Sequence, residues 1–173
     1  MYDLILNIIP YTVFFIALCY AAYTDVKTQK IKIWTFPVAA IISLPCVIAN
    51  IVMQEYWSFF FDFLPLIMGA ITGFGIFLFI ALIGKGGGAD AIMSGCIGLI
   101  FGISRLMEIF IVVIAIILLW TFYRFVLNKV EKKKYNLRQP YPLAPFVLTG
   151  YIFVLVSVSY THLRAHETRG NLV

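Results

Sequence analysis

The hydrophobic and polar positions along the chain form long apolar runs separated by short charged breaks. Several windows of roughly 18 or more residues carry no charge, which is enough for a helix to cross a hydrocarbon core of about 30 Å. The runs predict helices at 4–23, 34–53, 59–83, 90–103, 107–128 and 141–159. The fourth run is short, which indicates a tilted helix or one that begins inside the bilayer. The pattern therefore predicts an all-α, polytopic membrane protein of about six transmembrane helices.

The composition supports a membrane protein, since 62% of the residues are hydrophobic and 12% are charged. A water-soluble fold could not bury that much apolar surface. The first run is long and has no basic residues before it, so it is interpreted as a membrane helix and not as a cleavable signal peptide. Each cysteine lies in a different apolar run and none forms a CxxC pair, so we expect small core residues at Cys19, Cys46 and Cys96.

The basic residues predict the orientation, because cytoplasmic loops of membrane proteins are enriched in lysine and arginine. Alternate loops hold Lys27, Lys30, Lys32, Lys85, Arg124, Lys129, Lys132, Lys133, Lys134 and Arg138. The opposite loops hold Glu55, Glu108 and a single Arg105, and the amino-terminal segment holds Asp3. We therefore expect the amino terminus outside a plasma (inner) membrane and the basic loops in the cytoplasm.

The net charge of +5 follows from these loops, so membrane lipid is an expected partner. Nucleic acid is not expected, because no aromatic platform is interleaved with the basic residues. The stretch VSYTHLRAHETRGNLV changes composition abruptly and resembles a translated sequencing-library adapter. We predict a membrane domain over 1–157 and a non-native tail over 158–173. Both histidines, His162 and His166, lie in this tail, so no metal site is assigned to them despite their helical spacing.

Two aspartates are expected at the cytoplasmic boundary. Asp25 directly follows the first apolar run, and Asp90 opens the fourth within GKGGGADAIM. Ionisable groups at membrane depth are costly and often mark function. If the carboxyls approach to hydrogen-bonding distance, repulsion and partial desolvation leave one proton on the pair near neutral pH. One aspartate can then take a proton from water while the other donates to a carbonyl oxygen, as in aspartic proteases.

The glycines before Asp90 have a predicted role in this scheme. Gly86, Gly87 and Gly88 can adopt backbone conformations that are closed to other residues, and they have no side chain to block an extended peptide. Together with Ala89 they form the expected substrate-approach loop. The amino-terminal dipole of the following helix favours a carboxylate at Asp90.

A structural interpretation of both aspartates remains open at this point. Asp90 fits an ordinary residue at the start of a helix after a flexible turn. Asp25 fits an interfacial residue paired with Lys27 or Lys30.

In these residues the sequence resembles the type IV prepilin peptidase family. This is the GxGD class of intramembrane aspartyl proteases, which includes archaeal preflagellin peptidases. Asp25 and Ile31 match the family pattern D-x5-I-P-N that follows the first helix. Residues 87–90, GGAD, align with G-x-G-D. The segment YPLAPFVLTG, residues 141–150, resembles a P-x-A-P segment that opens a late helix in the family.

The sequence departs from the family pattern at four positions. Ala89 replaces the second glycine of G-x-G-D, which is the smallest change available. Lys32 and Ile33 stand where proline and asparagine are usual, and Ile92 stands where a lysine often follows the second aspartate. These departures predict a divergent branch with its own substrate preference.

The resemblance implies an aspartic endopeptidase that needs no metal or other cofactor, with Asp25 and Asp90 as the catalytic pair. Its implied substrate is a prepilin-like or preflagellin-like precursor, cleaved on the cytoplasmic side just before the hydrophobic segment. Larger members also methylate the new amino terminus and carry an added amino-terminal region. This chain starts directly in its first helix, so the resemblance implies a form without N-methyltransferase activity.

Two competing hypotheses remain at the level of the sequence. In a transporter or channel subunit, the two aspartates would bind protons or cations, and the glycines would form a broken helix. The aspartates lie in unlike contexts and no internal repeat is evident, which disfavours this reading. A catalytically inactive relative that acts as an assembly factor is the other hypothesis.

Overall fold

The computed structural model describes residues 2–53, 58–84, 87–131 and 143–170. Within these ranges the protein is all-helical and has no β-strand. The elements are α1 (Tyr2–Thr28), α2 (Thr35–Val52), the π-helix η1 (Phe59–Phe63), α3 (Leu64–Gly84), α4 (Gly88–Glu131) and α5 (Leu143–Gly170). The all-α class predicted from the apolar runs is therefore confirmed.

Four segments of these helices are long and apolar enough to cross a membrane: Ile8–Thr28, Thr35–Val52, Phe60–Ile83 and Gly88–Leu127. The apolar part of α5, Leu143–Ser157, is shorter. The two helices predicted at 90–103 and 107–128 form one element, α4, interrupted at Gly102 by non-helical backbone with φ 76° and ψ 172°. The chain is thus a multi-pass membrane protein, and the number of crossings depends on how α4 lies in the bilayer.

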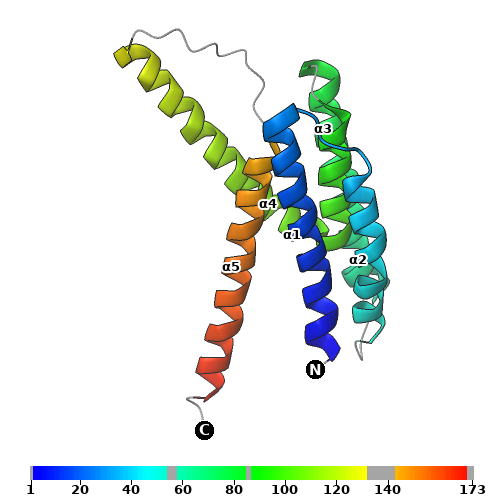
Figure 1. Cartoon of the computed structure of the whole chain (residues 1–173). Helices are drawn as coiled ribbons and strands as arrows, with labels where there is room; N and C mark the ends of the chain where they lie inside the picture. The colour runs from blue at the N-terminus through cyan, green and yellow to red at the C-terminus, as the bar shows by residue number, and fades with distance from the viewer. Residues whose placement is uncertain (1, 54–57, 85–86, 132–142, 171–173) are drawn as a thin grey trace.

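The helices run mainly up and down in a bundle, and the second part of α4 leaves it (Figure 1). α1 rises from the amino terminus, α2 returns, and α3 rises again beside α2. After Gly102, α4 extends obliquely to the upper left, while α5 descends next to α1. The end of α1, the start of α2 and the end of α3 therefore share the end of the molecule opposite the start of α1 (Figure 1).

The first part of α4 packs closely on α3 because small residues face each other. A Cβ atom added to Gly98 would overlap the backbone of Gly69 on α3. Nearby, the buried Ser94 hydroxyl donates a hydrogen bond to the carbonyl oxygen of Gly73, at 2.7 Å. Small residues allow such backbone approach in membrane proteins, where packing and hydrogen bonds hold helices together.

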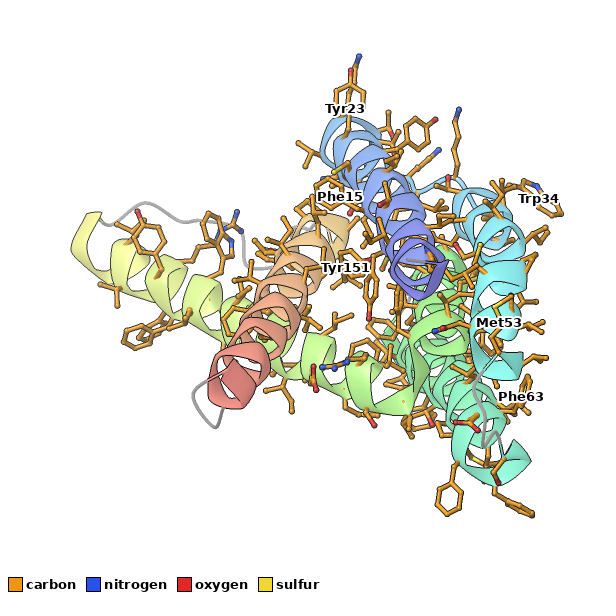
Figure 2. All side chains as sticks on the ribbon, turned by 90° about the horizontal axis from the view of Figure 1, so that it is seen from below. Phe15, Tyr23, Trp34, Met53, Phe63 and Tyr151 are labelled. Carbon is orange, nitrogen blue, oxygen red and sulfur yellow. The ribbon has the colours of Figure 1, made fainter. Side chains whose placement is uncertain are left out.

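An aromatic cluster ties α5 to α1 and α4. The Tyr151 hydroxyl donates to the carbonyl oxygen of Tyr11 at 2.9 Å. The Phe101 ring lies between them, with ring centroids 4.9 Å from Tyr11 and 5.6 Å from Tyr151. Figure 2 shows Tyr151 between α5 and α1, whereas Trp34 and Met53 point away from the bundle. This cluster anchors α5 against the rest of the core about two turns after the helix begins.

Two other predictions concern the cysteines and the tail. Cys19, Cys46 and Cys96 are unbonded and partly buried. α5 continues to Gly170, but the side chains after Ser157 lie outside the described ones. The predicted boundary between a domain over 1–157 and a tail over 158–173, with its two histidines, therefore stays a prediction.

Candidate active site

Asp25 lies in the last turn of α1, and its side chain is only 7% exposed. The helix ends three residues later, at Thr28, and Gln29 follows in the left-handed conformation with φ 52°. The N–H of Gln29 donates to the backbone oxygen of Asp25 at 2.8 Å, which is a common way to close a helix. This turn fixes the backbone of Asp25 at the boundary between α1 and the following loop.

The Asp25 carboxylate accepts a hydrogen bond from the start of α5. The backbone N–H of Ala144 donates to its Oδ2 at 3.0 Å in a fully buried position. Ala144 is the second residue of α5, where N–H groups have no partner within their own helix. Pro145 follows in the first turn, which is the part of a helix that accepts proline without losing a hydrogen bond.

Helix dipoles make this contact important for the charge of Asp25. A carboxylate at the carboxyl end of its own helix is disfavoured by the partial negative charge there. The amino-terminal end of α5 presents the opposite partial charge, and the Ala144 N–H supplies a direct donor. The Asp25 carboxyl therefore lies against the amino-terminal end of α5, whose Ala144 N–H donates to it.

Asp90 is the third residue of α4, and its side chain is partly buried. Its N–H donates to the carbonyl oxygen of Gly87 at 3.1 Å, which forms the turn that opens α4. Its carboxyl interacts electrostatically with that of Asp25. The structure thus brings together two acids that are far apart in the sequence.

The described contacts of Lys27 do not involve Asp25. The Lys27 ammonium donates to the Tyr23 hydroxyl at 3.4 Å and lies 5.6 Å from the centre of that ring. The ammonium of Lys32 lies 5.6 Å from the centre of the Tyr20 ring. The partner described for Asp25 is the amide of Ala144, for which no sequence pattern predicts a role at the site.

Gly87 and Gly88 leave open space beside Asp90, because they have no side chains. A Cβ atom added to Gly87 would lie 3.6 Å from Asp90 Oδ2, and one added to Gly88 would meet nothing within 4 Å. Neither residue has a positive φ in the structure, so the role predicted for them as a substrate-approach loop depends here on their missing side chains and stays a prediction. Gly86 lies outside the described residues, and Ala89 is partly buried.

A cavity of about 320 Å³ adjoins Asp90, between α3, α4 and the start of α5. Phe77 and Ala81 of α3 line it together with Phe110 and Ile117 of α4. Among the described residues that line it, Asp90 is the single charged one. Over the same described part of the chain, no group of three or more histidine, cysteine or acidic residues could hold a metal ion.

A sequence model of the type IV leader peptidase family matches residues 12–122. The chain belongs to the type IV leader peptidase family. The match includes Asp25, residues 87–89 and Asp90, so the resemblance found in these motifs is confirmed at the level of the family. As a member of this family, the chain is a membrane peptidase, a hydrolase whose substrates are prepilin-like precursors.

The family match ends before α5, so the contact between Ala144 and Asp25 comes from the structure alone. No curated protein and no solved structure matched the chain. The roles of individual residues therefore depend on the geometry of the site.

Proposed function

We propose that this chain is an intramembrane aspartic endopeptidase that removes the leader from prepilin-like or preflagellin-like precursors. Asp25 and Asp90 form the catalytic pair, at the cytoplasmic face of the plasma membrane. The observation that carries the proposal is that a buried Asp25 lies near enough to Asp90 for the two carboxyls to interact electrostatically, beside a cavity, in a member of the leader peptidase family.

The surroundings of the two acids favour different roles. Asp25 accepts a buried amide hydrogen bond, which holds its carboxyl in a fixed orientation and suits a general base. Asp90 faces an almost wholly apolar cavity, which suits the acid that carries the shared proton. The pair therefore begins a catalytic cycle with one proton, on Asp90.

These roles give a balanced hydrolysis of a peptide bond. Water adds to the carbonyl carbon while Asp25 takes a proton from it and Asp90 donates its own proton to the carbonyl oxygen. The tetrahedral intermediate then breaks its C–N bond. Asp25 passes its proton to the leaving nitrogen and Asp90 regains one from the hydroxyl group. Both acids return to their starting state, and no cofactor takes part.

The arrangement of the helices supports the proposed topology. The end of α1, the start of α2 and the end of α3 lie together, opposite the start of α1 (Figure 1). Asp25 is in the last turn of α1, and Asp90 is in the first turn of α4, which follows α3 in the chain. Basic loops favour the cytoplasm, which places the amino terminus outside. The break at Gly102 allows the two parts of α4 to act as separate crossings, which gives about six in total.

A cleavage assay tests the proposal. The chain is co-expressed with candidate precursors beside Asp25→Asn, Asp90→Asn and the control Asp62→Asn, at matched membrane levels. Asp62 is an aspartate of η1 whose carboxylate accepts the Ser58 N–H at 2.6 Å, away from the candidate site. We expect the wild type and Asp62→Asn to shorten a precursor at its leader junction and the other two to fail. Unimpaired cleavage by Asp25→Asn or Asp90→Asn would refute the catalytic pair.

A further inference from the structure

We infer that a second cavity, far from the candidate active site, binds a zwitterionic head that carries a phosphate and a primary ammonium group, as in phosphatidylethanolamine. The cavity has a volume of about 280 Å³ and is lined by residues of α1, α2, η1, α3 and α4. Asp62 and Arg105 line it and supply the two charges that the head needs. The inference goes beyond the proposed function and does not depend on it, because neither candidate catalytic carboxyl lines this cavity.

The cavity lies at the end of the bundle where lipid headgroups are expected. Leu6 near the start of α1 and Ile51 near the end of α2 both line it, and these helix ends are opposite the end of α1 that holds Asp25 (Figure 1). Asp62 is near the beginning of the membrane-spanning segment Phe60–Ile83. The ends of spanning helices lie at the level of the polar headgroups. A lipid head can therefore enter the cavity while its chains stay in the bilayer.

The two charged groups each bond within their own stretch of helix and not with each other. Asp62 Oδ2 accepts the Ser58 N–H at 2.6 Å, and Arg105 Nη1 donates to Glu108 at 2.8 Å. Within the described part of the chain, no hydrogen bond or ion pair uses Asp62 Oδ1 or the Nε and Nη2 of Arg105. Charged groups at membrane depth are costly and tend to mark a site. The cavity thus offers one carboxylate oxygen and a set of guanidinium donors to a ligand.

A proline in α1 adds an acceptor for the ammonium group. Pro10 lines the cavity together with Leu6. Proline has no N–H, so Pro10 cannot give the usual helical hydrogen bond to the carbonyl oxygen of Leu6, four residues earlier. A primary ammonium group has three N–H donors, which suit this oxygen and the Asp62 carboxylate. A choline head carries methyl groups in place of these donors and cannot form the same bonds.

Arg105 suits the phosphate of the same head. A guanidinium group presents its donors in a planar fork that matches phosphate oxygens, and the contact with Glu108 uses only Nη1. A simple anion would be repelled by Asp62, and a simple cation would be repelled by Arg105. A zwitterion satisfies both charges at once. The volume is close to the lower end of ligand pockets, which suits a headgroup and not a folded partner.

Lipid binding to the purified full-length protein in detergent tests the inference. Lipids with identical dioleoyl chains and ethanolamine, choline or glycerol heads are titrated, and Kd is obtained from the rise in Tm and from native mass spectrometry. We expect phosphatidylethanolamine to bind about tenfold or more tightly than the other two, because it alone offers donors to Asp62 and phosphate to Arg105. Soluble glycerophosphoethanolamine should bind at least about tenfold more weakly, since it has no chains to bury.

Three variants assign the preference to the cavity. Asp62→Asn and Arg105→Gln should each bring the Kd for phosphatidylethanolamine to within about twofold of that for phosphatidylcholine. Asparagine can still accept the Ser58 N–H, so the first variant keeps this turn. Glu108→Gln is the matched control, because Glu108 does not line the cavity, and it should keep the preference. Cleavage should not change in Asp62→Asn, since the cavity is far from the candidate catalytic pair.

Each other result would overturn a stated part of the inference. Equal affinities for the three lipids would refute the site and leave Asp62 and Arg105 to the structure of their own helices. Tighter binding of phosphatidylglycerol would refute the role of the ammonium group. Equal affinity for the soluble head would refute a lipid as its source, and a loss of preference in Glu108→Gln would refute the assignment to this cavity. If a variant does not fold, the comparison of lipids on the wild type still decides.

Discussion

The contact between Ala144 and Asp25 shows what a sequence can and cannot reveal about single residues. Asp25 and Asp90 could be proposed as a pair from the sequence, because a carboxyl at the boundary of an apolar run is rare and costly. The donor to Asp25 was not predictable, because every residue except proline carries the same backbone N–H. The proline-containing segment around Ala144 indicated where a late helix begins. Which of its amides reaches Asp25 depends on how α5 packs on α1.

This contact leads to a prediction about catalysis. Replacing the amide between Leu143 and Ala144 by an ester removes the donor to Asp25 and retains the side chains. A hydrogen bond to a charged group contributes about 1.5–3 kcal/mol, so kcat should fall by roughly ten- to a hundredfold. KM should change by less than about twofold, since the substrate does not bind the buried amide. Steady-state kinetics in proteoliposomes measure both constants.

An ester at Val147 is the control for this prediction. Val147 is a buried residue of α5, and its N–H lies beyond the first turn, within the helix. It should leave kcat close to the wild-type value. Equal losses from the two esters would mean that the Ala144 amide only holds α5 together.

Among the elements, α4 differs most from the sequence prediction. The charged residues Arg105 and Glu108 suggested a break between helices at 90–103 and 107–128. In the structure they pair with each other one turn apart, at 2.8 Å, so the helix continues through them. The interruption lies at Gly102, whose φ of 76° and ψ of 172° are accessible essentially to glycine alone. An apolar pattern cannot distinguish such a kink from a loop.

The close packing of α3 on α4 gives a prediction about stability. Gly98→Ala places a Cβ against the backbone of Gly69, so one of the two helices must move. Overpacking of this kind costs typically about 1–3 kcal/mol, and we expect a clear fall in the Tm of the purified protein. Thermal unfolding in detergent measures it.

Gly75→Ala is the control for this substitution, because a Cβ atom there meets nothing within 4 Å. Alanine also favours a helix over glycine by about 1 kcal/mol, so its Tm should be unchanged or higher. A Tm for Gly98→Ala that equals that of Gly75→Ala would contradict the close approach of the two helices.

For the whole molecule, the sequence predicted the helical membrane class, which is confirmed, and a common side for the basic loops, which stays a prediction. Both depend on long-range regularities, which are the length of apolar runs and the distribution of lysine and arginine. The oblique course of the second part of α4 and the position of α5 between α1 and α4 depend on particular packing contacts, such as that of Tyr151 with Tyr11. No periodicity encodes such contacts.

The orientation in the membrane is testable at this scale. In a variant without its native cysteines, Thr28→Cys at the end of α1 should react with an impermeant maleimide only from the cytoplasmic side. Met53→Cys after α2 should react only from outside. Both residues are exposed, so burial does not prevent the reaction. The reverse pattern, or labelling of both from one side, would contradict the orientation.

The central claim is that Asp25 and Asp90 act as one catalytic unit, and kcat/KM in proteoliposomes tests it most directly. The wild type, Asp25→Asn, Asp90→Asn and the double variant are compared on one precursor. Each single variant should lose activity by a factor on the order of 10³ or more, and the double variant should be no slower than the singles. A single variant that keeps more than about a tenth of the activity, or losses that multiply in the double variant, would contradict the account.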